Sequence, residues 1–331
     1  MPSVPLRDHI ADALFHPDHG YYTANIKTVG RRGDFSTSAT VGDALARAVA
    51  AWVVTTAKTH PKPLHLIEVG AGDGSLAASV NAALPWLLRR RLRFHIVEAS
   101  PVLAEQQKSR LGTRPTWHGS MPRAIAAVGG NAIVISNELV DAFPPTIFHW
   151  DATTSKWLEV FIDPETKAQS LHPAVPDYPP PTSPHNLPDG QRIEVHHSYH
   201  RWLTSWVPQT NHLTLFTVDY GDSFPALYHR RPTGTLRAYY AHQRFTGPEV
   251  FQRHGLQDIT TDVSFSALQE GGNSLGLSTS SLTTQRDFIR NHLALTEDQL
   301  FSSPSLTYLL DPYGPGTAFK VLIQEKIPPQ K

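Results

Sequence analysis

The most informative residues of the chain are a group of glycines and acids at the ends of two short apolar segments. The apolar run 64–69 contains Glu68 near its end, and the apolar run 93–98 ends in Glu98. Three glycines follow the first run at alternate positions: Gly70, Gly72 and Gly74. In a doubly wound sheet, a glycine turn after one strand and an acid after the next bind an adenosine ribose, because glycine admits close backbone approach and the carboxylate accepts hydrogen bonds from ribose hydroxyls. The sequence therefore predicts an adenosine-containing cofactor.

The spacing of the glycines indicates which cofactor this is. The pattern is G-x-G-x-G, whereas the dinucleotide fingerprint is G-x-G-x-x-G. Glu68 would repel a pyrophosphate but attract the sulfonium and ammonium groups of S-adenosylmethionine. A class I methyltransferase is therefore favoured over a nicotinamide-dependent oxidoreductase, and no G-x-x-x-x-G-K-[ST] pattern supports a P-loop. Glu68 and the turn, with Ala71, are expected to hold the methionine end, and Glu98, with Ala99 and Leu103, the adenosine end.

Further polar residues follow two later apolar runs, at 132–136 and 213–218. They are Asn137, Glu138 and Asp141 after the first run, and Asp219 and Tyr220 after the second. Because ligands bind outside the carboxyl ends of strands in such a sheet, we expect these residues at the site. A helix cap or a turn explains any one of them equally well, but their joint placement favours a site. His242, in the segment 234–242, is a candidate substrate contact or a local cap.

The apolar runs and the segments between them predict an α/β fold, a Rossmann-like class I methyltransferase sheet with an N-terminal segment and an α+β insertion. The expected strands are 64–69, 93–98, 132–136, 213–218 and 318–324, and the expected helices are 41–58, 75–88 and 101–111. An insertion is expected between the third and fourth strands. It contains a hairpin of 148–150 with 156–162, an irregular loop over 172–190 in which seven of nineteen residues are proline, and a helix over 194–207.

These elements predict three parts. Residues 1–60 form a segment covering cofactor and substrate, 61–147 and 210–331 form the methyltransferase core, and 148–209 form the insertion. The 331 residues suffice for a full core, and equal totals of 29 basic and 29 acidic residues argue against a nucleic-acid or membrane-surface binder. The N-terminus lacks the apolar stretch of a signal peptide, and no apolar run approaches membrane-spanning length, so a bacterial cytoplasmic protein is expected.

Metal binding is not expected from the sequence. The chain contains no cysteine, which excludes thiolate sites and disulfides, and it contains 18 histidines. His196 and His200 are four residues apart on an expected helix, a spacing that could hold a metal. We nevertheless expect none there, because no third ligand converges on the pair.

Taken together, the segments resemble the MidA family of S-adenosylmethionine-dependent methyltransferases, whose mitochondrial members assist assembly of respiratory complex I. The resemblance spans nearly the whole chain in one order. The matching segments are HGYYT (19–23), GRRGDFSTS (30–38), IEVGAGDGSLA (67–77), IVEASPVLAEQQ (96–107), SNELVDAFP (136–144), VDYG (218–221), GTLRAYYAH (234–242), DITTDVSF (258–265), TTQRDFI (283–289) and FKVLIQEK (319–326). The chain departs from the family at 38–40, where a proline, an acid and a serine are usual, and at Ala241, where a basic residue is common. Both departures concern the substrate rather than the cofactor.

The resemblance implies methyl transfer to a protein arginine, giving symmetric dimethylarginine in a complex I subunit of the 49-kDa type. Glu138 and Asp141, with Asn137, are then the expected catalytic residues, because two carboxylates can clamp a guanidinium. The resemblance also places Asp34, Phe35 and Thr37 over the methionine moiety, Asn137 at the cofactor, and Asp219, Tyr220 and His242 at the substrate. A homodimer is compatible with the sequence. A cofactor-binding assembly or scaffold protein, or a methyltransferase for another protein or a small molecule, remains an alternative.

Overall fold

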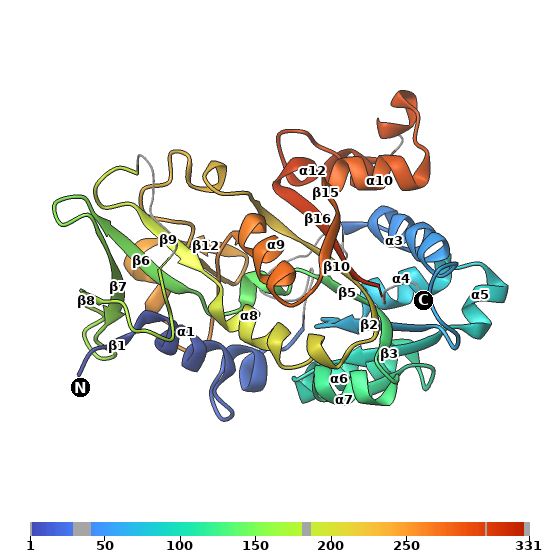
Figure 1. Ribbon diagram of the computed structural model, residues 1–331, viewed down its shortest axis with the longest axis horizontal. Coiled ribbons are helices and arrows are strands. Elements are labelled where there is room, and N and C mark those ends of the chain that lie inside the picture. Colours follow the sequence, from blue (N-terminus) through green and yellow to red (C-terminus); the bar gives the residue numbers. More distant parts are fainter. Residues whose placement is uncertain (1, 29–40, 181–186, 302, 328–331) are drawn as a thin grey trace. The chain divides into compact units, whose positions relative to one another are not determined.

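The computed structural model describes residues 2–28, 41–180, 187–301 and 303–327. The chain divides into two compact units, each built from separated segments (Figure 1). The sheet unit comprises Lys27–Leu139, Leu203–Tyr220 and Gln269–Lys331, and the hairpin unit comprises Met1–Ile26, Val140–Trp202 and Gly221–Leu268. Residues 221–268, which the sequence assigned to the methyltransferase core, lie in the same unit as most of the predicted insertion.

The sheet unit is built on a largely parallel sheet with strand order β15-β16-β10-β5-β2-β3-β4. Its strands are β2 (His65–Val69), β3 (Arg93–Val97), β4 (Thr116–His118), β5 (Asn131–Asn137), β10 (His212–Asp222), β15 (Ser278–Thr284) and β16 (Phe319–Lys326). β10, β5, β2, β3 and β4 run parallel, and β16 runs antiparallel to both of its neighbours. Every residue of β2 is buried, as expected for a central strand covered on both faces. The predicted α/β fold is confirmed.

Helices in the sheet unit pack around this sheet. They are α3 (Ala44–Thr56), α4 (Ser75–Ala83), α5 (Trp86–Arg91), α6 (Pro101–Leu111), α7 (Met121–Ala127), η3 (Val207–Gln209), α10 (Gln285–Leu293), η6 (Glu297–Phe301), α11 (Pro304–Leu309) and α12 (Pro315–Ala318), and α9 (Phe265–Ser274) ends in this unit. Leu45, Val49 and Val53 of α3 belong to the same buried cluster as Leu66 of β2 and Phe216 of β10. The apolar spacing that predicted a helix over 41–58 is therefore the spacing of its packed face.

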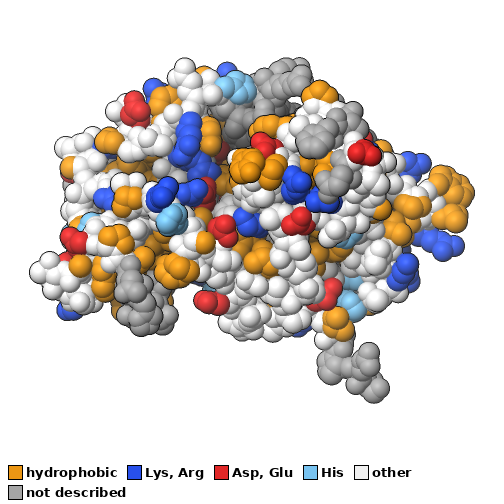
Figure 2. Space-filling view, turned by 90° about the horizontal axis from the view of Figure 1, so that it is seen from above, with side chains coloured by type: hydrophobic (Ala, Val, Ile, Leu, Met, Phe, Trp, Pro, Cys, Tyr) orange, Lys and Arg blue, Asp and Glu red, His pale blue; other side chains and the backbone are white. Residues whose placement is uncertain are grey.

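The expectation of one helix from the glycine turn to residue 88 was wrong. α4 ends at Ala83, and α5 begins at Trp86. Pro85 lacks a backbone N–H, and Leu84 before it is extended, as residues preceding proline usually are. The short helix α5 exposes Trp86 and Leu87, which are 57% and 61% accessible, above an arginine-rich last turn. Figure 2 shows hydrophobic and basic side chains together at the right-hand end of the view, where α5 lies.

The hairpin unit contains an antiparallel sheet of order β1-β7-β6-β9, with β8 paired to β7, and a smaller sheet of order β12-β11-β13. Its strands are β1 (Val4–Pro5), β6 (Thr146–Asp151), β7 (Lys156–Ile162), β8 (Gln169–Pro173), β9 (Arg192–Val195), β11 (Arg237–Tyr240), β12 (Gln243–Phe245), β13 (Asp258–Thr260) and β14 (Val263–Ser264), which pairs with the end of β10. Its helices are α1 (Leu6–Phe15), η1 (Tyr21–Asn25), η2 (Val140–Ala142), α8 (His197–Thr204), η4 (Ala226–Tyr228), η5 (Gly247–Phe251) and the first turn of α9. The predicted hairpin of 148–150 with 156–162 is confirmed as β6 and β7.

The predicted helix over 194–207 was wrong at its start. Residues Arg192–Val195 form β9, which pairs antiparallel with β6, and α8 begins only at His197. The backbone of Glu194 lies in this ladder while its buried side chain accepts a 2.7 Å hydrogen bond from the Thr235 amide. Pairing with a strand distant in sequence has overridden the local helical pattern. Among the described residues, no helix has the length and apolar composition needed to cross a membrane.

Candidate functional site

The glycine turn between β2 and α4 has the backbone that the sequence predicts for it. Gly70, Gly72 and Gly74 have φ angles of 64°, 54° and 79°, in the left-handed region that favours glycine. The Gly70 amide donates to the carbonyl oxygen of Val97, at the end of β3, over 3.0 Å. A Cβ at Gly70 would lie 2.8 Å from Cδ1 of Leu139. The turn is thus fixed against the end of β3 on one side and borders the segment after β5 on the other.

Glu68 lies one residue before the end of β2, and its side chain is buried. It is 2% accessible, and among the described residues its Oε2 has no hydrogen-bond partner. Burial, with repulsion from Asp73 and Glu98, raises the pKa of Glu68 to about 8. A desolvated carboxyl group gains most from a neighbouring positive charge, because such a charge offsets the cost of ionisation. Glu68 therefore suits a cationic ligand group.

Glu98 follows β3 directly, and hydrogen bonds from backbone amides and from a side chain hold its carboxylate. Its Oε1 accepts from the Ser100 amide at 2.9 Å, and its Oε2 accepts from Nε2 of Gln107 at 2.8 Å. Burial raises the pKa of Glu98, and the hydrogen bonds from Ser100 and Gln107 oppose that rise. The carboxyl group lies at the strand end where a ribose is expected, with a fixed orientation.

Gln107 is a site residue that the sequence reading left without a role. Its side chain is fully buried on α6, and its Nε2 donates to the Gly72 carbonyl oxygen at 2.9 Å as well as to Glu98. Its Oε1 accepts from Nε1 of Trp117 in β4 at 3.1 Å. One amide thus ties the glycine turn to the acid after β3. Gln107 is the last residue of the segment 96–107 that resembles the MidA family, and this resemblance is the feature of the sequence that points to it.

The other predicted cofactor residues differ in what the structure shows of them. Ala99 is exposed, and Leu103 is buried in the first turn of α6, where its amide lies 3.4 Å from Oγ of the capping Ser100. Ala71 is buried within the glycine turn. The three residues predicted to lie over the methionine moiety, Asp34, Phe35 and Thr37, fall outside the described residues.

Asn137 and Glu138 lie at the carboxyl end of β5, between two strands that contribute to the site. Ser136 pairs with Val69 of β2, and Asn137 pairs with Val218 of β10. Glu138 has a φ of 50°, which is uncommon for a residue with a side chain, and its amide donates to the Val218 carbonyl oxygen at 2.9 Å. Nδ2 of Asn137 donates to Oε1 of Glu138 at 3.2 Å. This partly buried pair stands at the same sheet edge as Glu68, the glycine turn and Glu98.

Asp219 and Tyr220 continue β10 beyond this point. Asp219 is fully buried, and its Oδ1 accepts a 2.9 Å hydrogen bond from the Tyr220 amide. The ring of Tyr220 makes an edge contact with Phe319 of β16, with centroids 5.5 Å apart. These contacts account for both residues structurally, and their part in substrate binding stays a prediction.

Asp141 and His242 belong to the hairpin unit. Asp141 lies in η2, and its Oδ2 accepts from Oγ1 of Thr260 in β13 at 2.8 Å. In the same unit the hydroxyl of Tyr22 donates to Oδ1 of Asp258 at 2.7 Å. His242 is exposed in the turn between β11 and β12, where it and Ala241 both have positive φ, as in the tight turns that connect hairpin strands. The turn accounts for His242, and the clamp by Glu138 and Asp141 stays a prediction.

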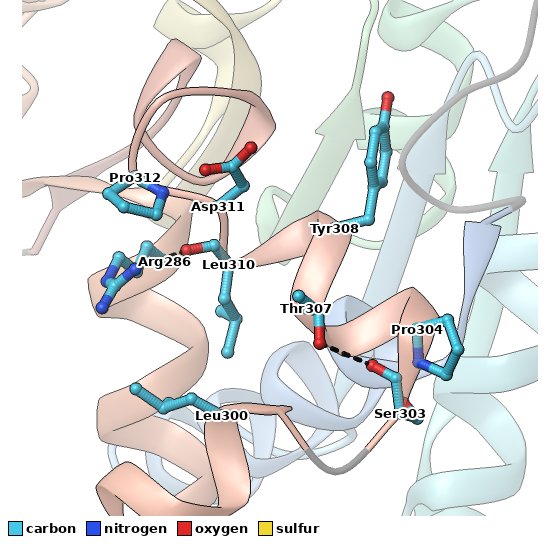
Figure 3. Close-up of a pocket in the computed structure, with 9 residues that line it drawn as sticks. All are labelled: Arg286, Leu300, Ser303, Pro304, Thr307, Tyr308, Leu310, Asp311 and Pro312. Atoms are coloured by element: carbon cyan, nitrogen blue, oxygen red, sulfur yellow. Dashed lines mark hydrogen bonds between the residues drawn. The ribbon is translucent and has the colours of Figure 1, made fainter.

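The histidine pair considered for a metal does not lie on one helix. His196 precedes α8, and its Nε2 lies 3.1 Å from Oγ1 of Thr261, whereas His200 is exposed. A separate cavity of about 520 Å³ lies in the sheet unit (Figure 3). It is lined by Arg286, Leu300, Ser303, Pro304, Thr307, Tyr308, Leu310, Asp311 and Pro312, and so by none of the predicted site residues.

The site in the sheet unit can bind an adenosine cofactor with a positively charged end. Its parts are the glycine turn, the two acids and the Asn137–Glu138 pair, which share the carboxyl edge of neighbouring parallel strands. Glu98 can accept hydrogen bonds from ribose hydroxyls, and Glu68 can face a cation. The buried carboxyl of Glu68 fits S-adenosylmethionine and disfavours a pyrophosphate.

Comparisons with known proteins agree with this geometry. The sequence profile of a family of S-adenosyl-L-methionine-dependent methyltransferases matches residues 45–283. The chain is 26% identical over 376 residues to the protein arginine methyltransferase NDUFAF7 homolog, mitochondrial, of Drosophila melanogaster, covering 96% of this chain and 80% of that protein. It is 26% identical over 326 residues to protein arginine methyltransferase NDUFAF7, mitochondrial, of Danio rerio, covering 87% of this chain and 72% of that protein.

A solved structure shows the same fold. A Burkholderia thailandensis protein crystallised with bound S-adenosyl-homocysteine superposes with a TM-score of 0.78 at 24% identity, covering 98% of this chain and 88% of that one. The family match covers well over half of the chain and includes the glycine turn, both acids and the Asn137–Glu138 pair. The chain belongs to the MidA family of S-adenosyl-L-methionine-dependent methyltransferases.

Proposed function

We propose that this methyltransferase methylates arginine side chains of a protein substrate. The observation that carries the proposal is the placement of Glu138, a carboxylate at the end of β5 whose backbone has a positive φ and whose Oε1 accepts from Asn137. Uncommon backbone conformations of this kind are frequent at functional sites. The relatives named as protein arginine methyltransferases, at 26% identity, support the same reading.

The chemistry requires a carboxylate next to the cofactor. S-adenosylmethionine supplies a methyl group on a sulfonium, which is displaced in line by a nucleophile. A guanidinium is protonated in water and is a poor nucleophile, so a carboxylate must pair with it, orient one nitrogen and help remove its proton. Glu138 can do this because Leu139, the next residue, borders the glycine turn at Gly70. Asp141 is proposed as the second carboxylate of the clamp.

The proposed substrate is the complex I subunit of the 49-kDa type, and the proposed product is symmetric dimethylarginine. This part of the proposal rests on the family resemblance, and the relatives named as protein arginine methyltransferases support only arginine as the acceptor residue. A cytoplasmic location in a bacterium is proposed with it. The departures at 38–40 and Ala241 lie in segments that the resemblance assigns to the substrate side, so the acceptor needs a direct test.

The test is transfer of labelled methyl from S-adenosylmethionine to the 49-kDa-type subunit of the same organism, followed by acid hydrolysis and amino-acid analysis. We expect label in symmetric dimethylarginine. Glu138→Gln should lower the rate about 10²- to 10⁴-fold, the usual contribution of a general base, while cofactor affinity stays nearly unchanged. Glu270→Gln is a matched control, because Glu270 is an exposed glutamate in the same unit.

The outcomes separate the alternatives. Label in another protein or in a small molecule would keep the methyltransferase and replace the acceptor. Loss of cofactor binding in Glu138→Gln would move Glu138 from catalysis to the cofactor site. An absence of transfer to any fraction of a cell extract, with cofactor binding intact, would favour an assembly or scaffold role.

A further inference from the structure

Imidazoles gather around one carboxylate at the end of α1, in the hairpin unit, and none of these residues is among those assigned to the cofactor. Asp12 lies in the last turn of α1, His16 follows the helix as its cap, and His19 lies three residues further on. One ligand atom from each of these three side chains lies within 4.8 Å of the other two. His16 and His19 lie beyond the helix, in a turn that the Gly20 amide closes by donating to the His16 carbonyl oxygen at 2.8 Å.

A further histidine reaches the same carboxylate from a distant part of the chain. Nε2 of His254 lies 2.6 Å from Oδ2 of Asp12, and Nε2 of His19 lies 3.0 Å from the same oxygen. Ligand atoms around a tetrahedral zinc ion, with bonds of about 2.0–2.2 Å, are about 3.3 Å apart. To match this spacing, the Asp12 oxygen would have to move about 0.7 Å away from Nε2 of His254 and about 0.3 Å away from Nε2 of His19.

The two segments that carry these ligands are fixed to each other. Nδ2 of Asn25 donates to the carbonyl oxygen of His19 at 2.8 Å and to that of Gly255 at 2.9 Å. Gly255 has a φ of 74°, and a Cβ there would clash with the His19 carbonyl oxygen. The close approach of the two segments is thus specified by a glycine and an amide, which hold the backbone next to His19 against the backbone next to His254.

We propose that Asp12, His19 and His254 bind a divalent transition-metal ion, with zinc as the best fit. Two imidazole nitrogens and one carboxylate oxygen suit zinc and its neighbours, whereas calcium and magnesium prefer oxygen ligands. His16 stacks on His19, with ring centroids 3.7 Å apart, and is in reach of the fourth position. Without a metal, Nδ1 of His16 accepts a 3.2 Å hydrogen bond from the Asp18 amide. Ligation of the ion through Nε2 would put the ring proton on Nδ1 and so remove this hydrogen bond.

The ion would act as a structural link within the hairpin unit. It would join residues 12–19 to residue 254, next to the segments that contain Tyr22 and Asp258. Those two side chains are joined by a 2.7 Å hydrogen bond, and they lie in two of the segments that resemble the MidA family. The inference is independent of the acceptor of the methyl group, since it concerns a part of the chain that needs no turnover to be observed.

Zinc and cobalt titrations of the untagged, metal-free full chain test the proposal. We expect one zinc ion per chain by isothermal titration calorimetry, and a visible absorption spectrum typical of tetrahedral coordination with cobalt. His254→Ala and Asp12→Asn should each weaken zinc binding at least about 100-fold, since even partners outside the ligand set commonly contribute 10- to 100-fold. Zinc should also raise the melting temperature of the wild type by mass action, and of these variants much less.

His229→Ala is the matched control, because His229 is an exposed histidine of the same unit. With 18 histidines in the chain, an adventitious ion only is the competing outcome. Unchanged zinc affinity in both ligand variants, or several equivalent weak sites, would overturn the proposal. An octahedral cobalt spectrum in the wild type would also overturn it, and this measurement does not depend on how well any variant folds.

Discussion

Glu68 combines a carboxyl group with nearly complete burial at the end of a central strand. Burial is the largest cause that raises its pKa to about 8, and repulsion from Asp73 and Glu98 adds to it. At neutral pH the free protein therefore carries Glu68 mostly protonated. A cofactor with an ammonium and a sulfonium would stabilise the ionised form, so binding and proton release are coupled at this residue.

This coupling predicts proton release on cofactor binding. At pH 7, binding of S-adenosylmethionine to the wild type should release close to one proton more than binding to Glu68→Gln, because the glutamine has no proton to lose. The measurement is isothermal titration calorimetry in buffers of different ionisation enthalpy. The variant serves as the control for the cofactor's own amine, which titrates in the same range.

Equal proton release by the two proteins would contradict the prediction. It would mean that Glu68 stays protonated beside the cofactor, or that the methionine end binds elsewhere. Unchanged affinity in Glu68→Gln together with equal release would remove Glu68 from the cofactor site.

Single residues of the site were predictable to the extent that strand ends position them. Glu68 and Glu98 could be assigned because the ends of two neighbouring parallel strands must meet at one edge. Gln107 could not, since its role depends on three contacts, to Gly72, Glu98 and Trp117, that no local pattern announces. His254 likewise meets Asp12 only because distant segments of the hairpin unit are folded together.

At the scale of elements, α6 connects the glycine turn to the end of β3 through Gln107. Gln107→Met keeps the length of the side chain but removes both donated hydrogen bonds. Glu98 would then lose the hydrogen bond from this side chain, and the turn would lose its link at Gly72. We expect the dissociation constant for S-adenosylhomocysteine to rise about tenfold. This is the size of effect that the loss of one hydrogen bond to a charged group has.

A positioning role for Gln107 can be distinguished from general damage to the fold. If Gln107 acts through Glu98 on the ribose, the loss should nearly vanish for a 2′-deoxy analogue of the ligand, and it should not add to the loss in Glu98→Ala. Gln106→Leu is the control, since that neighbour bonds only to the Lys27 carbonyl among the contacts described. Equal losses for both ligands would assign Gln107 to stability alone.

Elements were predictable where one property decided them. The central strands are continuous apolar runs, because both faces of a parallel sheet are covered, and α3 and α6 carry clear helical spacing or a proline at the first turn. β9 was mistaken for helix because its pairing with β6 depends on residues about 45 positions earlier. The strands β4 and β15 are short or polar, so nothing in their composition separated them from loops.

Across the whole molecule, many buried histidines stay neutral. His65, His95 and His118 form a ladder across β2, β3 and β4 in which successive ring nitrogens are 3.0 Å apart. Burial, then the neighbouring histidines, lowers the pKa of His95 to about 4. Burial also lowers the pKa of His9, His60, His196 and His197 to about 4.

Two buried glutamates have raised pKa values and therefore affect the pH dependence of stability in the opposite direction. Burial is the main cause that raises the pKa of Glu68 to about 8 and that of Glu194 to about 7. A histidine whose pKa is lowered by folding contributes its full share to the free energy of unfolding above 6.5, its pKa in the unfolded chain. This contribution is lost as the pH falls toward 4, its pKa in the folded protein. A glutamate with a raised pKa gives full stability below its unfolded value of 4.5 and loses it as the pH rises through its folded value.

The free energy of unfolding should therefore be greatest near pH 6.5 and fall on both sides. Toward pH 5 the five histidines outweigh the two glutamates by about three protons, so the loss of unfolding free energy approaches ~4 kcal/mol per pH unit. Toward pH 8 only the glutamates act, and the loss of unfolding free energy is smaller.

Urea unfolding of the metal-free protein at pH 5, 6.5 and 8, at constant ionic strength and with a chelator present, measures the acidic and the alkaline arm of this profile. His95→Gln should flatten the acidic arm and leave the alkaline arm unchanged, because it removes one titrating ring from the ladder. A maximum at pH 5, or an acidic arm equally steep in His95→Gln, would show that the buried rings take up protons in the folded state.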